Sequence, residues 1–171
     1  FDSWIGVLSP EQYRRHVRPH SKWILDRLEK TGVPVISFGT NTNGFLEDFA
    51  GAGGSVIGVD WRVNIDAARA VLGPNIAVQG NLDPLALFLP TTELRARVDD
   101  ILTRAGPVGH IFNLGHGILP PTNPDAAKAL VAAGCAVLFY DVAPTEAYIR
   151  LVMEDRPLRL ERGDVLDLPQ M

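Results

Sequence analysis

Four short apolar segments, each followed by a polar turn and a helical pattern, constrain the fold of this chain most strongly. The segments are VPVISFG (33–39), SVIGVDW (55–61), NIAVQGNLDP (75–84) and GHIFNLGHG (109–117). Strands that are buried on both faces of a parallel sheet read as nearly continuous apolar runs. The helical patterns between them supply the long crossovers that parallel strands require. The order therefore predicts an α/β fold built on a parallel sheet.

Amphipathic patterns with start and stop signals predict the helices that alternate with these strands. Ser9 and Gln12 match a capping box, and Pro19 is expected to kink or split the helical segment that follows. The later part of that segment carries one apolar stripe, formed by Trp23, Ile24 and Leu28. The expected helical segments are 8–32, 44–54, 64–73, 91–106 and 123–134.

The first residues, FDSW, are typical of the end of a strand and include no initiator methionine. We therefore expect the natural sequence to extend upstream. With FDSW included, polar residues and glycines follow the ends of five expected strands: Ser3, 39–43, 60–62, 79–83 and 113–117. Barrels and open sheets of parallel strands both place their active sites at this edge.

The stretch NLGHG (113–117) is the most unusual of these strand ends. Gly115 and Gly117 permit a close approach between the backbone and a ligand, and torsions that a side chain forbids. His116 either points into a pocket shared with the other loops or is a loop histidine without a role. The spacing alone does not decide between the two.

Composition excludes several classes of protein. The chain has 171 residues, 46% of them hydrophobic and 21% charged, with a net charge of −4. These values fit about one packed domain and no nucleic-acid surface. The single cysteine, Cys135, rules out an internal disulfide and disfavours a thiolate metal site. No signal peptide or apolar run of transmembrane length is present, which indicates a soluble, cytoplasmic protein that contacts no membrane.

Other polar residues near the strand ends have structural explanations. Asp60 and Trp61 either line a pocket or pack, and packing is favoured for the tryptophan. Asn81 and Asp83 either contact a substrate or cap the following turn. Two asparagines suit a turn: Asn41 and Asn43. Three histidines are expected to have no catalytic role: His16, His20 and His110. Three arginines are interpreted as a solvated helix face: Arg14, Arg15 and Arg18.

Four motifs together resemble the uroporphyrinogen decarboxylase family: FDSW…LSPEQY, GVDWRV, QGNLDP and HIFNLGHGILPPTNP. The resemblance covers residues 1 to about 133 and implies the C-terminal portion of a (β/α)8 TIM barrel, with about five parallel strands and helical crossovers. We therefore expect a partial barrel over 1–133 and a divergent, unrecognised tail over 134–171. In the tail, a strand over 136–142, a helix from about Thr145 and a hairpin over 158–168 are expected.

The resemblance also implies an activity. Enzymes of the family remove carbon dioxide from the four acetate side chains of uroporphyrinogen III, which gives coproporphyrinogen III in haem biosynthesis. They use no metal or organic cofactor and usually form homodimers. Ser3 and His116 resemble the serine and histidine that bind substrate carboxylates. The family's arginines, which lie in an RQAGRY-type segment, and its aspartate have no counterpart here and are expected upstream. No catalytic residue is therefore assigned to this chain, which by itself is expected to be inactive and poorly soluble.

Two alternatives stay open beside this interpretation. A corrinoid-linked methyltransferase has a similar fold but needs a zinc site of His and Cys ligands, and NLGHG supplies no thiol. The second alternative is a non-catalytic relic of a barrel. The upstream coding sequence would separate the relic from the decarboxylase.

Overall fold

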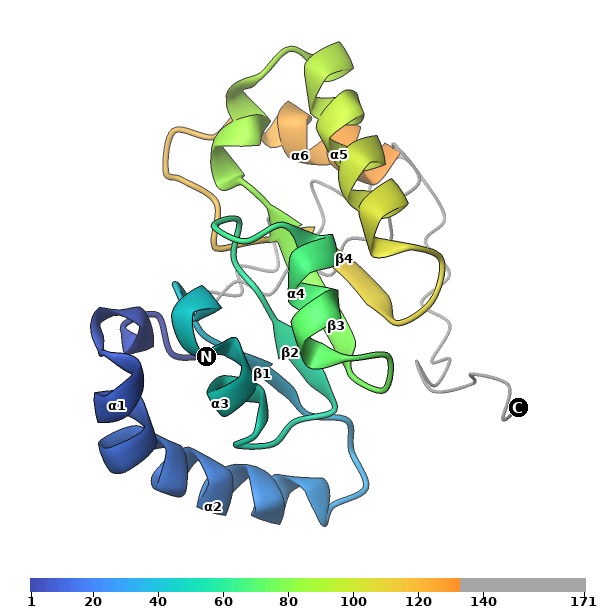
Figure 1. Cartoon of the computed structure of the whole chain (residues 1–171). Coiled ribbons are helices and arrows are strands. Elements are labelled where there is room, and N and C mark those ends of the chain that lie inside the picture. The colour runs from blue at the N-terminus through green and yellow to red at the C-terminus, as the bar shows by residue number, and fades with distance from the viewer. Residues whose placement is uncertain (133–171) are drawn as a thin grey trace. The chain divides into compact units, whose positions relative to one another are not determined.

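A computed structural model describes residues 1–132, which lie within one compact unit. Its centre is a sheet of four parallel strands in the order β1-β2-β3-β4 (Figure 1). The strands are β1 (Ile36–Phe38), β2 (Val56–Gly58), β3 (Ala77–Leu82) and β4 (His110–Leu114). Each strand therefore pairs with the next one along the chain, as the alternating sequence pattern predicts. The expectations for the tail lie outside the described residues.

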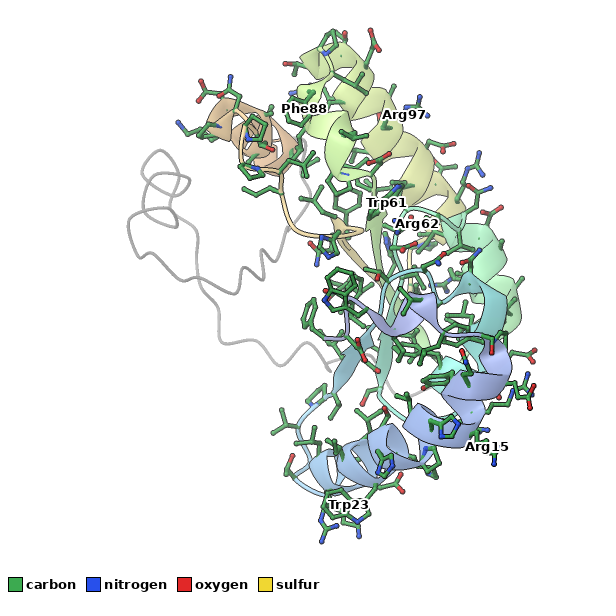
Figure 2. The ribbon with its side chains drawn as sticks, turned by 90° about the vertical axis from the view of Figure 1, so that its left-hand side faces the viewer. Arg15, Trp23, Trp61, Arg62, Phe88 and Arg97 are labelled. Carbon is green, nitrogen blue, oxygen red and sulfur yellow. The ribbon has the colours of Figure 1, made fainter. Side chains whose placement is uncertain are left out.

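Helices precede β1, connect the consecutive strands and follow β4. They are η1 (Ile5–Val7), α1 (Pro10–Gln12), η2 (Tyr13–Val17), α2 (Arg18–Glu29), η3 (Asn43–Phe45), α3 (Leu46–Ala50), α4 (Ile65–Leu72), η4 (Pro84–Phe88), α5 (Thr91–Ala105) and α6 (Pro124–Ala132). The helix expected over 44–54 is thus a 3-10 turn followed by a short α3. Figure 2 shows α3, α4 and α5 on the same side of the strands.

The core lies between the sheet and these helices. Ile57 pairs with Val78 in the register of β2 and β3, and both side chains are fully buried in one cluster with residues of the helices. Leu94 and Val98 of α5 are buried in a second cluster with residues of β3 and β4, as their spacing predicts. Burial of one large aliphatic side chain contributes about 1.5–3 kcal/mol. The sheet is therefore held mainly by its helix-covered face.

The segment FDSW runs beside β1, as its strand-like pattern predicts. Asp2 forms a parallel bridge with Gly39. The Asp2 backbone N–H donates to the Phe38 carbonyl at 2.9 Å, and the Thr40 N–H donates to the Asp2 carbonyl at 3.3 Å. The first residues thus extend the parallel arrangement by one strand end beyond the four regular strands.

The first helical segment is not split at Pro19, and it runs without interruption from Pro10 to Glu29. The Ser9–Gln12 capping box is present at its start. A π-helical turn, η2, then precedes α2, and Pro19 lies in the first turn of α2. The Arg18 N–H still donates to the Tyr13 carbonyl, so the change from α to π geometry, and not a chain break, precedes the proline.

The apolar stripe on α2 does not face the core of the described residues. Its side chains are largely exposed: Trp23 is 61% exposed, Ile24 50% and Leu28 45%. The inward face is instead formed by Leu25 and Glu29, one turn apart. Glu29 accepts a hydrogen bond from the Gly54 N–H at 2.8 Å, and Leu25 lies directly against Gly53. The stripe and the contacting face are therefore on different sides of the helix.

Two of the arginines expected to form a solvated face have a partner. Arg14 and Arg18 bind the Asp48 carboxylate of α3 at 2.7 and 3.4 Å. These side chains are part-exposed, so each pair contributes little stability by itself. Sequence spacing gave no sign of this pair, because Asp48 lies 30 or more residues away along the chain.

Tyr13 yields a prediction about stability. Its ring is fully buried and stacks on Phe45 at 4.8 Å, and its hydroxyl has no hydrogen-bond partner among the described residues. An unsatisfied buried polar group costs about 1–3 kcal/mol. We therefore expect Tyr13→Phe, in a protein that contains this segment, to raise the free energy of unfolding by about 1 kcal/mol. Denaturant titration at pH 8 measures this, and a lower value would contradict the burial argument.

The same side chain predicts a dependence on pH. Burial raises the pKa of Tyr13 to about 12, whereas the pKa of a tyrosine in the unfolded chain is near its ordinary value of 10.0. Between these values the unfolded state loses its proton first, so stability falls as the pH rises. The gain from Tyr13→Phe should therefore be larger at pH 11 than at pH 8. Equal gains at both pH values would rule this out.

Candidate functional site

Asp60 lies at the carboxyl end of β2 and joins two loops. The residue is 3% exposed. Its Oδ2 accepts a hydrogen bond from the Asn41 backbone N–H at 2.6 Å and binds the Arg62 guanidinium at 2.6 Å. Its Oδ1 accepts from the Arg62 backbone N–H at 2.9 Å. The carboxylate thus connects the loop after β1 to the loop after β2. Asn41 has a φ of 56°, a left-handed torsion that asparagine tolerates.

Asn81 ties β3 to the same loop. Its side-chain N–H group donates to the Asp60 carbonyl at 3.2 Å and also to the Val63 carbonyl. Asp83 caps the following turn, because its carboxylate accepts from the Leu85 N–H at 2.9 Å. The sequence left two roles open for these residues, contact with a substrate or capping of the turn. The structure shows the cap for Asp83, whereas Asn81 links β3 to the loop after β2. Asn81 also lies within β3 and not in the polar loop that was expected there.

Gly115, just after β4, is in close contact with the loop after β2. A Cβ atom at this position would lie 2.6 Å from the Trp61 backbone nitrogen and 3.1 Å from the Asp60 backbone. The Gly115 N–H also donates to the Leu82 carbonyl at 2.7 Å. Only glycine fits such a contact. A Cβ on Gly117 would meet nothing within 4 Å, so close packing within the described chain explains the first glycine of NLGHG and not the second.

His116 follows this contact and has an exposed side chain. Its ring centroid lies 6.4 Å from the ring of Phe38 and 6.4 Å from that of Trp61. Arg62 lies over the Trp61 ring at 4.2 Å (Figure 2). The histidine therefore lies near two aromatic rings from the ends of two other strands. Trp61 is half-buried and reaches this histidine, so it does more than pack behind the strand.

Ser3 lies at the same edge of the sheet, beside β1. Its carbonyl accepts a hydrogen bond from the Thr40 hydroxyl at 2.6 Å, and its side chain is exposed. The Phe38 ring lies 4.9 Å from the ring of Phe1, two residues before Ser3, and 6.4 Å from that of His116. The structure thus brings the two sequence-predicted binding residues to one edge, with no hydrogen bond between them in the described part of the chain.

Sequence reasoning did not single out Phe38. An aromatic residue at the end of an apolar strand reads as core, and its exposure of 5% agrees with that. Its position beside His116 depends on strand register, which no local pattern reveals. The sequence gave only a weak indication of the Asp60–Arg62 ion pair. A carboxylate and a cation lie two residues apart directly after a buried strand.

The other histidines lie away from this group. His16 and His20 are exposed on η2 and α2. His110 opens β4, and its ring N–H donates to the Gly80 carbonyl at 2.7 Å. Burial lowers the pKa of His110 below its usual value, which favours the neutral ring. Its hydrogen bond to the Gly80 carbonyl links β4 to β3, which is a structural role.

The described residues contain neither a cluster of metal-ligand side chains nor a helix that could span a membrane. Within residues 1–132, no three His, Cys, Asp or Glu side chains are placed so that they could hold a metal ion. Over the same range, no helix combines the length and the apolar character needed to cross a membrane.

Comparison with known proteins gives a consistent family. The family model for uroporphyrinogen decarboxylase matches residues 1–136. A uroporphyrinogen decarboxylase of Myxococcus xanthus is 59% identical over 133 residues, which are 78% of this chain and 38% of that protein. Proteins of the same name from Solibacter usitatus and Carboxydothermus hydrogenoformans are 52% and 54% identical over 132 residues, 77% of this chain and 38% of each. The chain thus spans just over a third of the length of these relatives.

A solved structure supports the fold. A methyltransferase from Methanosarcina mazei matches with a TM-score of 0.61 and 23% identity, over 74% of this chain and 37% of the other. At this identity the likeness concerns the fold alone. The four parallel strands with helical crossovers are part of a (β/α)8 barrel, as the sequence predicts.

Proposed function

We propose, from the premise that this chain belongs to the uroporphyrinogen decarboxylase family, that it forms the carboxyl-terminal part of a uroporphyrinogen decarboxylase. The proposal rests on the residues matched by the family model and on relatives that are 48–59% identical. One structural observation carries it: the exposed His116 is held at the carboxyl edge of the sheet by the close contact of Gly115 with the loop after β2. This is the edge where barrels of this type place their active sites.

The reaction converts each acetate side chain of uroporphyrinogen into a methyl group. A pyrrole ring carbon accepts a proton, and the bond between the acetate methylene and its carboxylate breaks. The electron pair of that bond neutralises the cationic ring as carbon dioxide leaves. The exocyclic methylene then takes up a proton to become a methyl group, and the ring carbon returns the first proton. Each acetate thus consumes one proton and releases one carbon dioxide. The groups that transfer these protons are expected on the upstream part of the protein.

The part played by this chain is the binding of substrate carboxylates by Ser3 and His116. A hydroxyl and an imidazolium are suitable donors for a carboxylate, and the charged donor forms the stronger bond. Trp61 is half-buried beside the histidine and offers aromatic surface to a pyrrole ring, whereas the buried Phe38 packs behind the histidine. The buried network around Asp60 supports these residues, because preorganised groups bind without a cost of rearrangement.

The family also suggests the setting of the reaction. We include in the proposal that the full-length protein is a cytoplasmic homodimer that needs no metal or organic cofactor. Sedimentation velocity of the full-length protein tests the dimer, and activity measured in a chelator tests the independence from metal. Loss of activity that returns when a metal is added would refute the cofactor-free claim.

A chimera allows this segment to be tested in a complete protein. We replace the matched 133 residues of the Myxococcus xanthus relative by those of this chain, and we express the product in cells that lack their own uroporphyrinogen decarboxylase. Restored growth without added haem is the expected result. A chimera that is folded and abundant but does not restore growth, beside an intact relative that does, would favour the non-catalytic relic.

The methyltransferase alternative is supported by a similarity of fold alone. The methyltransferase structure shares the fold at 23% identity, whereas relatives at 48–59% identity carry the name uroporphyrinogen decarboxylase. The decarboxylase is therefore the function proposed.

A further inference from the structure

We propose that Asp60 is a positioning residue, which places His116 for substrate binding through the contact between the loops after β2 and β4. This inference rests on the proposed function. It assigns no contact between Asp60 and the substrate. It concerns how a buried carboxylate at one strand end sets the position of an exposed histidine at another.

Several hydrogen bonds hold the Asp60 carboxylate in one position. Its side chain is 2% exposed and accepts hydrogen bonds from three donors, two of them backbone N–H groups of different loops. Burial of a carboxylate is unfavourable unless it is paired and hydrogen-bonded. Asp60 meets both conditions through the Arg62 guanidinium and the N–H groups of Asn41 and Arg62. An aliphatic side chain at this position would leave these donors without their acceptor.

The link from Asp60 to the histidine is short and made of backbone. Gly115 lies against the Asp60 Cα and carbonyl carbon and against the Trp61 nitrogen, so closely that its missing Cβ would be 2.6 Å from that nitrogen. His116 is the next residue along the chain. A shift of the Asp60 backbone therefore moves the surface on which the His116 loop rests.

A second contact passes through side chains. The Arg62 guanidinium binds the Asp60 carboxylate at 2.6 Å and lies 4.2 Å from the centre of the Trp61 ring. The Trp61 ring meets His116 edge-on, with centroids 6.4 Å apart and planes inclined by 73°. Asp60 thus holds the cation that lies over this ring. The backbone contact reaches Gly115, the residue before His116, and the side-chain contact reaches the His116 ring itself. His116 is therefore the group through which Asp60 would act.

The test is a double-mutant cycle in the chimera described above, with kcat and KM measured for uroporphyrinogen. Asp60→Asn keeps the size of the side chain but turns a new N–H group toward existing donors. We expect kcat/KM to fall about ten- to a hundred-fold, the effect of a small misplacement of a binding group. In a chimera that already carries His116→Asn, the same change should cost less than about threefold, because residues that act as a unit are not additive.

Arg62→Met provides a second variant in case Asp60→Asn does not fold. Arg62 is 43% exposed, and after its replacement the Asp60 carboxylate loses its ion pair but still accepts hydrogen bonds from the backbone N–H groups of Asn41 and residue 62. The replacement should also lower kcat/KM in the presence of His116 and have little effect in its absence. Asp99→Asn is the matched control, since Asp99 is exposed on α5, and it should leave kcat/KM unchanged.

The outcomes separate the inference from the function on which it rests. An inactive parent chimera would count against the proposed function. An active parent in which the Asp60 or Arg62 losses are equally large with and without His116 would overturn the inference alone. The inference is also wrong if folded Asp60→Asn and Arg62→Met chimeras keep the kcat/KM of their parent.

Discussion

Gly115→Val in the full-length chimera should lower kcat/KM for uroporphyrinogen by more than about a hundred-fold. The Cβ of any side chain here would lie 2.6 Å from the Trp61 nitrogen, so the His116 loop must move away from the loop after β2. An added side chain in a packed contact costs about 1–3 kcal/mol of stability. The free energy of unfolding should therefore fall as well, and both quantities are measured on one preparation.

Gly117→Ala is the matched control for folding. A Cβ there meets nothing within 4 Å, so this variant should keep the stability of its parent. The packing argument fails if Gly115→Val and Gly117→Ala have the same free energy of unfolding. It also fails if Gly115→Val retains full turnover.

His116→Asn should reduce kcat/KM about ten- to a hundred-fold, since a charge-assisted hydrogen bond contributes on the order of 1.5–3 kcal/mol. Asparagine keeps a donor but loses the positive charge. Turnover should not vanish, because the groups that transfer protons are expected outside this chain. Stability should change by less than about 1 kcal/mol, as the side chain is exposed.

The alternative for this residue predicts the reverse result. A histidine that serves only the loop would lower the melting temperature when replaced and leave turnover per folded molecule intact. Unchanged kcat/KM at several pH values would show that His116 binds no substrate carboxylate.

The architecture could be predicted from the sequence because the pattern is local. The apolar runs, the capping box at Ser9 and the glycines that end helices are each set by neighbouring residues, and strand order follows from alternation. The short segment FDSW is also found beside β1, as its strand-like pattern predicts. In contrast, the face that α2 buries could not be predicted. Trp23 outweighs Leu25 in any apolar pattern, yet Leu25 meets Gly53.

The candidate site was predicted in part. Family motifs pointed to Ser3 and His116, and the structure places both at the carboxyl edge of the sheet. The supporting contacts are long-range, and so no local pattern contained them. Asn41 bonds Asp60 from 19 residues away, and Gly115 meets Trp61 from the end of another strand. Such pairs follow from strand register, which is known only once the sheet is assembled.

The central claim is that this segment builds the substrate site of a uroporphyrinogen decarboxylase. The most direct test is the amount of carbon dioxide released per uroporphyrinogen consumed by the purified chimera, under anaerobic conditions and with coproporphyrinogen measured as product. The account predicts four carbon dioxide molecules for each coproporphyrinogen formed. A folded chimera that releases none, while the intact Myxococcus xanthus relative turns over in the same buffer, would contradict it.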